Sequence, residues 1–126
     1  MVSEEYKVSA AKAYLQHVRD ICELMALMDT TMFLARYNGM NDKDFYREQE
    51  RRLDRYAAER RRALRAIDDV ADCDYGVPRD VMRMWVFEGK SYETIGDELG
   101  YEVSTIKRAM KKGRKRLYDV MPIEYK

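Results

Sequence analysis

The stretch that most constrains the fold runs from Ser91 to Met121, SYETIGDELGYEVSTIKRAMKKGRKRLYDVM, and predicts two helices joined by a tight turn. Ser91 can cap a short helix over residues 92–99, because its hydroxyl can accept a backbone N–H of the first turn. Gly100 is predicted to end that helix, since glycine readily takes the positive φ of a helix C-terminus. After the turn, we expect Ser104 to cap a second helix over residues 104–119. The pattern is typical of a helix-turn-helix.

The periodicity of the second helix separates a buried face from an outer face. At about 100° per residue, one side of the helix is apolar. It carries Ile106, Ala109, Met110, Gly113, Leu117 and Val120. The opposite side carries Ser104, Arg108, Lys111 and Lys115, flanked by Thr105, Lys107 and Lys112.

Seven basic residues lie between Ile106 and Leu117 with no acid among them. Like charges three and four residues apart repel along a helix, so helix stability does not explain this row, whereas a polyanionic partner would. A basic face that is only solvated is the alternative, and the turn pattern directly upstream favours nucleic acid.

A family resemblance joins these features. The stretch from Trp85 to Leu117, WVFEGKSYETIGDELGYEVSTIKRAMKKGRKRL, resembles the region 4 helix-turn-helix of sigma-70 family factors. It is still more similar to the sigma-like phage regulators of the RinA and ArpU type. The resemblance rests on the GKSYETIG opening, the LGY turn, the STIKR entry and the basic helix that follows. It covers the C-terminal part of the chain well and residues 1–75 only in general character.

The resemblance implies a phage or prophage transcription regulator that acts in the host cytoplasm and engages host RNA polymerase. The reading residues that it implies are Ser104, Thr105, Lys107, Arg108 and Lys111, and we add Lys112 and Lys115 from their place on the basic helix. Gly113 departs from the pattern, because alanine is common there. It either permits close packing against Trp85 or Met82 or loosens the helix.

Upstream, the pattern predicts two long helices that form an antiparallel hairpin. The first is expected from Ser9 to Tyr37, where apolar residues recur in alternating steps of four and three. This seam comprises Tyr14, Val18, Ile21, Met25, Met28, Met32 and Ala35. Asn38 and Gly39 break the helix, and Asn41 or Asp42 can cap the second helix, expected from Lys43 to Ala71. Its inner edge comprises Phe45, Gln49, Leu53, Tyr56, Arg60, Ala63 or Leu64, Ile67 and Val70. A third helix is expected from Pro78 to Glu88.

Composition narrows the possible functions. The formal net charge of the 126-residue chain is only +1, but the charge is unevenly distributed, with basic blocks at residues 47–65 and 104–126. Acids interleave with the arginines of the first block, so we interpret it as a solvated surface, with a second DNA contact as the alternative. Cys22 and Cys73 stand alone and are expected to be reduced. Asp68, Asp69, Asp72 and Asp74 lack the further ligands of a metal site. No catalytic constellation, cofactor motif, signal peptide or membrane span is predicted.

The sequence therefore predicts an all-α protein with a long helical hairpin at residues 1–75 and a sigma region 4-like helix-turn-helix at residues 76–126. The expected function is sequence-specific binding of double-stranded DNA in transcription regulation, without enzymatic activity, cofactor or metal. The alternative is the DNA-recognition subunit of a phage small terminase. We expect a homodimer joined along the seam at Val18, Ile21, Met25, Met28 and Met32. The target DNA sequence and the direction of regulation do not follow from the sequence.

Overall fold

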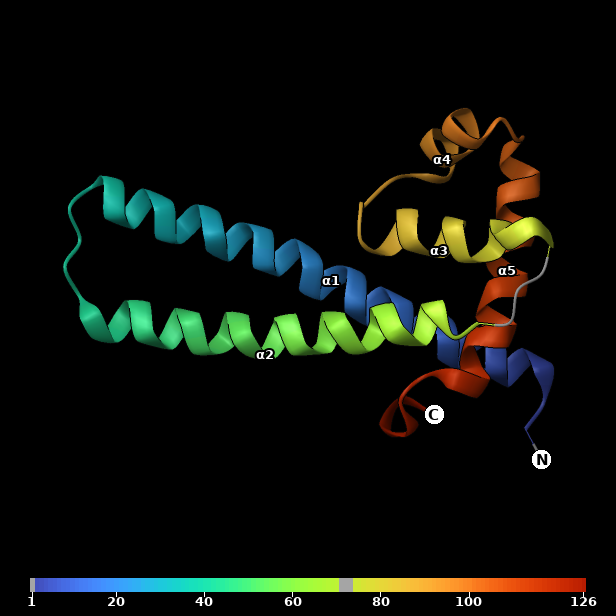
Figure 1. The fold of residues 1–126 in the computed structure, drawn as a ribbon, viewed down its shortest axis with the longest axis horizontal. Helices are drawn as coiled ribbons and strands as arrows, with labels where there is room; N and C mark the ends of the chain where they lie inside the picture. Colours follow the sequence, from blue (N-terminus) through green and yellow to red (C-terminus); the bar gives the residue numbers. More distant parts are fainter. Residues whose placement is uncertain (1, 71–73) are drawn as a thin grey trace.

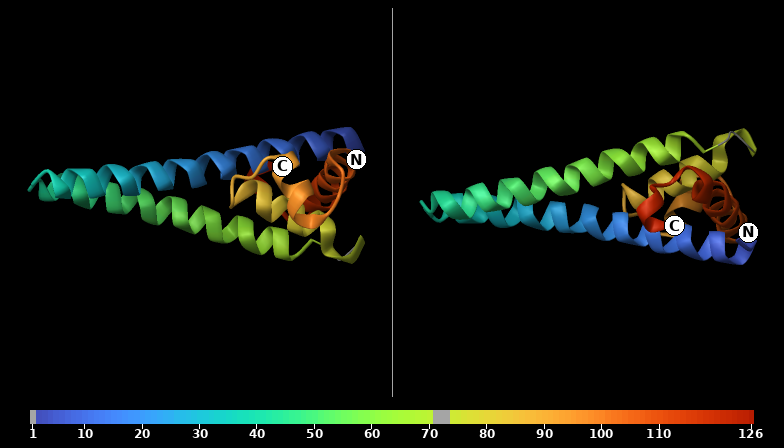
Figure 2. Two further views of the ribbon diagram at one scale, coloured as in Figure 1. Left: turned by 90° about the horizontal axis from the view of Figure 1, so that it is seen from above. Right: turned by 90° about the horizontal axis from the view of Figure 1, so that it is seen from below.

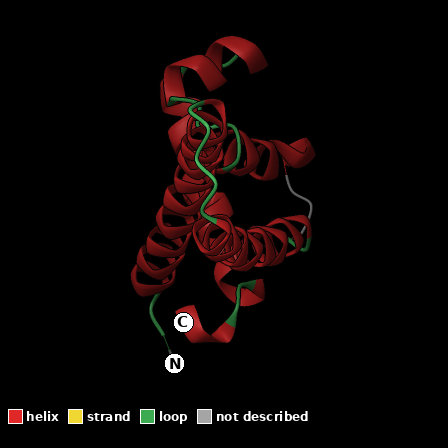
Figure 3. Ribbon diagram, turned by 90° about the vertical axis from the view of Figure 1, so that its left-hand side faces the viewer, coloured by secondary structure: helices red, strands yellow, loops and turns green. Residues whose placement is uncertain are grey.

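The computed structural model describes residues 2–70 and 74–126, and in these residues it contains helices and loops but no strand (Figure 3). The five α-helices are α1 (Glu4–Tyr37), α2 (Lys43–Asp68), α3 (Val77–Val86), α4 (Tyr92–Leu99) and α5 (Val103–Val120). Two short 3-10 helices are η1 (Asp74–Gly76) and η2 (Ile123–Tyr125). The predicted all-α class and the long helical hairpin are confirmed (Figure 1). No helix among the described residues is both long enough and apolar enough to cross a bilayer.

The ends of the hairpin helices follow from local capping. Ser3 accepts a hydrogen bond from the backbone N–H of Tyr6, so α1 begins at Glu4 and not at Ser9, where we placed it. The start of α2 at Lys43 is confirmed, because Asp42 accepts two N–H groups of the first turn. The end of α2 is wrong in our prediction, since the helix stops at Asp68. Residue 71 lies outside the described residues.

Helices α4 and α5 follow one another as predicted, but the cap that we predicted for α5 is wrong. Ser91 accepts the N–H of Thr94 at 3.2 Å, and Gly100 has φ +77°, so α4 begins and ends as expected. However, α5 begins at Val103, and the extended residue before it, Glu102, is the cap. Ser104 therefore lies in the first turn of α5 and does not cap it. The expected helix over residues 78–88 is α3, which spans Val77–Val86.

A single cluster of buried residues joins the base of the hairpin to the C-terminal helices. Seen from above and below, α1 and α2 lie close together at their tip and diverge toward the other end, where α5 lies between them (Figure 2). Leu15 of α1, Ile67 of α2, Met82 of α3 and Ile106 of α5 are all fully buried in this cluster. The hairpin and the C-terminal helices thus share one core.

The apolar faces are buried largely as the periodicity predicts. In the seam of α1, Met25 and Ala35 are half-buried, whereas the other members are buried within the single chain. The seam is therefore not available to a second copy, contrary to our expectation, because α2 and the C-terminal helices cover it. On α2, Ala63 is buried and Leu64 is exposed. On α5, Tyr118 is buried in place of the expected Val120.

Candidate nucleic-acid interface

The two faces of α5 differ completely in burial. On its inner face, Ile106, Met110 and Leu117 are fully buried. On the outer face Ser104, Lys107, Arg108, Lys111, Lys112 and Lys115 are exposed and Thr105 is half-buried. The seven sequence-predicted site residues therefore lie together on one helix. A helix fixed so firmly on one side presents the other side as a rigid row.

Two contacts hold α5 in place beside the core. The guanidinium of Arg114 donates to the hydroxyl of Tyr92 at 3.1 Å, which joins α5 to the first residue of α4. Gly113 faces Met82 of α3 so closely that an added Cβ would lie 3.0 Å from the Met82 methyl carbon. The absence of a side chain at residue 113 thus permits the close packing against Met82 that was one of our two expectations.

The N-terminal half of the outer face is open. Arg108 donates to the hydroxyl of Thr105 at 3.3 Å, a contact within the same helix that leaves most of its guanidinium donors available. Among the described residues, neither Lys107 nor Lys111 has an ion-pair partner. This half of α5 can therefore offer its positive charges to a ligand without breaking an internal ion pair.

The C-terminal half of the outer face is partly neutralised by carboxylates from two other elements. The Lys112 ammonium lies 2.6 Å from Asp74 of η1, and the Lys115 ammonium lies 2.6 Å from Glu4 in the first turn of α1. The hydrogen bond and the positive charge of Lys115 lower the pKa of the Glu4 carboxyl below its ordinary value. A polyanion that approached this half would have to compete with both carboxylates.

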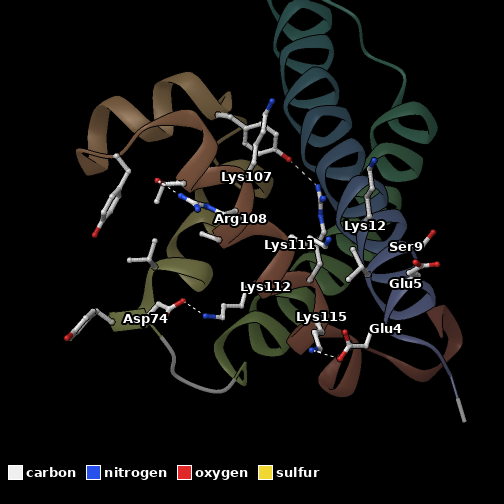
Figure 4. Close-up of a pocket in the computed structure, with 18 residues that line it drawn as sticks. Glu4, Glu5, Ser9, Lys12, Asp74, Lys107, Arg108, Lys111, Lys112 and Lys115 are labelled. Carbon is white, nitrogen blue, oxygen red and sulfur yellow. Dashed lines mark hydrogen bonds and ion pairs between the residues drawn. The ribbon is translucent and has the colours of Figure 1, made fainter.

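The outer face of α5 lies in an open hollow of about 1370 Å³, with the first turns of α1 on one side and η1 on the other. Figure 4 shows Lys112 directed to Asp74 at one edge and Lys115 directed to Glu4 at the other. Lys12 of α1 adds a further positive charge to the lining, and Tyr75, which is fully exposed, adds an aromatic ring.

Sequence reasoning did not place Glu4, Lys12, Asp74 or Tyr75 at this face. Their positions depend on how α1 and η1 pack against α5, which is a relation between segments distant in the sequence. The unusual backbone of η1 is visible in the structure but not in the sequence. Asp74 and Tyr75 both have positive φ, at 47° and 58°. Such values are uncommon for residues other than glycine.

The other candidate features show no comparable arrangement. Among the described residues, no group of three or more histidine, cysteine, aspartate or glutamate side chains is placed to hold a metal ion. Asp72 and Cys73 lie outside those residues. Cys22 is a half-buried free thiol, and burial raises its pKa. On α2, arginines pair with acids, as between Arg62 and Glu124 at 2.5 Å.

Comparison of the chain with protein-family models, with curated proteins and with solved structures found no match in any of the three.

Proposed function

We propose that the chain is a sequence-specific double-stranded DNA-binding protein that regulates transcription, with α5 as its reading helix. One observation carries this proposal: α5 buries Ile106, Met110 and Leu117 on one side and exposes a basic face on the other, with no acidic residue between Val103 and Tyr118. A helix of this kind fits the major groove of B-DNA, which is roughly 12 Å wide. Neither a cofactor nor catalysis is part of the proposed activity.

The open half of α5 is suited to reading bases. From Ser104 to Lys111 the helix advances by roughly 10 Å, which is comparable to the width of the groove. Arg108 lies in the middle of this segment and is exposed, and arginine can donate two hydrogen bonds to the major-groove edge of guanine. Lys107 and Lys111 flank it and are suited to phosphate contacts.

The proposed type of regulator rests on the resemblance to the sigma-70 region 4 and to the RinA and ArpU phage regulators. In that proposal the protein acts in the cytoplasm of a bacterial host and contacts host RNA polymerase. The feature that supports this resemblance is the order α3, α4, the turn at Gly100 and α5, with the proposed reading helix as the last α-helix.

The test is selection of binding sites from random double-stranded DNA, followed by affinity measurements on the selected site and on a random duplex. Arg108→Ala should weaken binding to the selected site by roughly 1–3 kcal/mol more than binding to random DNA, because one bidentate base contact is lost. Arg55→Ala on α2 is the matched control and should leave both affinities unchanged. Failure to select any site would refute sequence-specific binding, and equal losses on both duplexes would show that Arg108 contacts only phosphate.

The number of subunits in the purified protein distinguishes a transcription regulator from a DNA-packaging subunit. A monomer or dimer that retains selected sites supports the regulator, whereas a ring of many subunits would support the small terminase subunit instead. Pull-down of purified bacterial RNA polymerase tests the proposed contact directly, and its absence would restrict the proposal to DNA binding alone.

A further inference from the structure

In the half of the hairpin nearest its turn at residues 38–42, no described element covers the outer side of α1. Of the described helices, α1 and α2 alone extend there, because α3, α4 and α5 pack at the other end (Figures 1 and 2). Ile21, Met28 and Met32 on the inner side of α1 are buried. Because α2 packs against this inner side, it leaves the opposite side of α1 uncovered.

The opposite side of α1 is also apolar. Leu27, Phe33, Leu34 and Tyr37 are exposed to 62%, 65%, 50% and 80%. At about 100° per residue these side chains lie on one face of the helix together with Ala26 and Thr30. We call this set the outer strip: Ala26, Leu27, Thr30, Phe33, Leu34 and Tyr37. The rings of Phe33 and Tyr37 are already stacked, with centroids 6.4 Å apart.

Burial of the outer strip against a partner would leave the threonine hydroxyls of its central turn hydrogen-bonded. Thr30 donates its hydroxyl to the carbonyl of Ala26 at 3.1 Å, and the neighbouring Thr31 donates to the carbonyl of Leu27 at 2.9 Å. Both hydroxyls are therefore satisfied within the helix, and burial of the strip does not incur the cost of an unpaired polar group. Asp29, the one charged residue between Leu24 and Arg36, lies on the edge of the strip.

The sequence of the strip is symmetric about Thr30. Leu27 and Phe33 lie three residues before and after it, Ala26 and Leu34 four residues, and Glu23 and Tyr37 seven residues. In an antiparallel pair of helices related by a two-fold axis at Thr30, the members of each of these pairs would face one another across the interface.

These facing pairs are chemically complementary. Leu27 would lie against Phe33 of the partner subunit, and the small Ala26 would accommodate the partner's Leu34. The Tyr37 hydroxyl could donate to the partner's Glu23. In the single chain the Glu23 side chain is 67% exposed, and its ion-pair partner among the described residues is Arg19 at 3.7 Å. A parallel pair would instead bring two Glu23 carboxylates together, which is unfavourable.

The exposed area suits a weak dimer. Two aromatic rings and two leucines, each at least half exposed, offer roughly 400–500 Å² per copy. A pair would bury roughly 800–1,000 Å² in total, which is the lower limit for a specific interface. An apolar patch of this size is within the range of the largest patch on a typical monomer, and such patches are often functional.

We propose that the outer strip is the interface with a second copy of this chain, packed antiparallel about Thr30. The two α5 helices then lie at opposite ends of the pair. From Thr30 to Ala11, beside α5, is 19 residues, so the two reading helices are separated by roughly 57 Å along the hairpins. This distance exceeds the single helical turn of DNA, roughly 34 Å, that separates the half-sites of a compact dimer.

Sedimentation equilibrium of the full chain at micromolar concentrations tests the interface, independently of any DNA. We expect reversible association to two chains. Phe33→Asp should give one chain of unchanged helicity, because Phe33 is exposed in the single chain. Ile123→Asp is the matched control, since Ile123 is 83% exposed on η2 and lies off the strip. A wild-type chain that stays monomeric, an association that Phe33→Asp leaves intact, or association beyond two chains would overturn the proposal.

Disulfide formation tests the antiparallel register in a background with Cys22→Ser and Cys73→Ser. An equimolar mixture of Leu27→Cys and Phe33→Cys chains should form the mixed disulfide dimer under mild oxidation faster than either variant forms a dimer alone. A faster Leu27→Cys homodimer would show a parallel pair and would overturn the proposed arrangement.

Discussion

Replacement of Gly96 by alanine should destabilise the protein, although alanine is the better helix former. The added Cβ would lie 2.6 Å from the carbonyl oxygen of Tyr101, whereas Cβ contacts below 3.0 Å are essentially never seen in proteins. That oxygen belongs to the turn between α4 and α5. The turn is fixed, because the backbone N–H groups of Gly100 and Tyr101 both donate to the Gly96 carbonyl at 2.9 Å. The helix or the turn must therefore move by roughly 0.4 Å or more.

The size of the effect follows from two opposing terms. Overpacking of a rigid contact costs roughly 1–3 kcal/mol, and alanine returns roughly 0.5–1 kcal/mol of helix propensity over glycine. At the midpoints of these two ranges the expected net loss is about 1 kcal/mol, or roughly 3–5 °C in Tm for a chain of this size. Thermal and urea unfolding followed by far-ultraviolet circular dichroism measure both quantities, and the urea m-value should not change.

Gly113→Ala is the matched control on α5. There the added Cβ would meet the flexible end of Met82, with its methyl carbon at 3.0 Å and its sulfur at 3.1 Å. A side chain can rotate where a backbone carbonyl cannot, so this variant should lose less stability than Gly96→Ala. A Gly96→Ala protein as stable as the wild type, or a larger loss for Gly113→Ala, would refute the assignment of Gly96 as the rigid contact.

Two further predictions concern charge. Glu4→Gln releases Lys115 for a phosphate contact, and one extra contact should raise the affinity for any DNA by about fivefold at physiological salt and steepen the salt dependence by about one unit of slope. Glu5→Gln is the control, because Glu5 has the same charge but no ion-pair partner among the described residues. It should change the DNA affinity and the salt slope less than Glu4→Gln does. Equal effects of the two variants in fluorescence-anisotropy titrations would contradict the release of Lys115 as the cause. Burial raises the pKa of Tyr14 to about 12, so the folded chain resists its ionisation; stability should be intact below pH 10 and fall as the pH rises toward 12. Tyr14→Phe should reduce that alkaline loss in urea unfolding, and an identical loss in the variant would mean that other groups cause it.

Local signals in the sequence were sufficient for most helix ends. Ser91 and Gly100 act as predicted, because a cap and a left-handed glycine need only a few neighbouring residues. The start of α1 had a similar signal, Ser3 followed by two glutamates, which our prediction passed over. The cap at Ser104 failed because Val103 already adopts helical geometry after the extended Glu102.

The basic face of α5 was predictable, whereas its surroundings were not. Periodicity places all seven predicted site residues on one side of a single helix, and the structure brings them together there. That Glu4 and Asp74 neutralise part of this face depends on the packing of α1 and η1. Apolar periodicity shows which side of a helix is buried but does not show which neighbour covers it. For the same reason the seam of α1 was assigned to a second copy, although elements of the same chain cover it.

The contact between α1 and α5 also has a consequence for folding during synthesis. Helix α1 is synthesised well before α5, against which it packs, and the Tyr6 hydroxyl donates to the Lys126 carbonyl at 2.6 Å. Contacts this distant in sequence form late and slow the folding of an otherwise helical chain. Until α5 has emerged, Tyr14, Leu15 and Val18 lack part of their cover, so the nascent hairpin exposes apolar surface of the kind that chaperones shield.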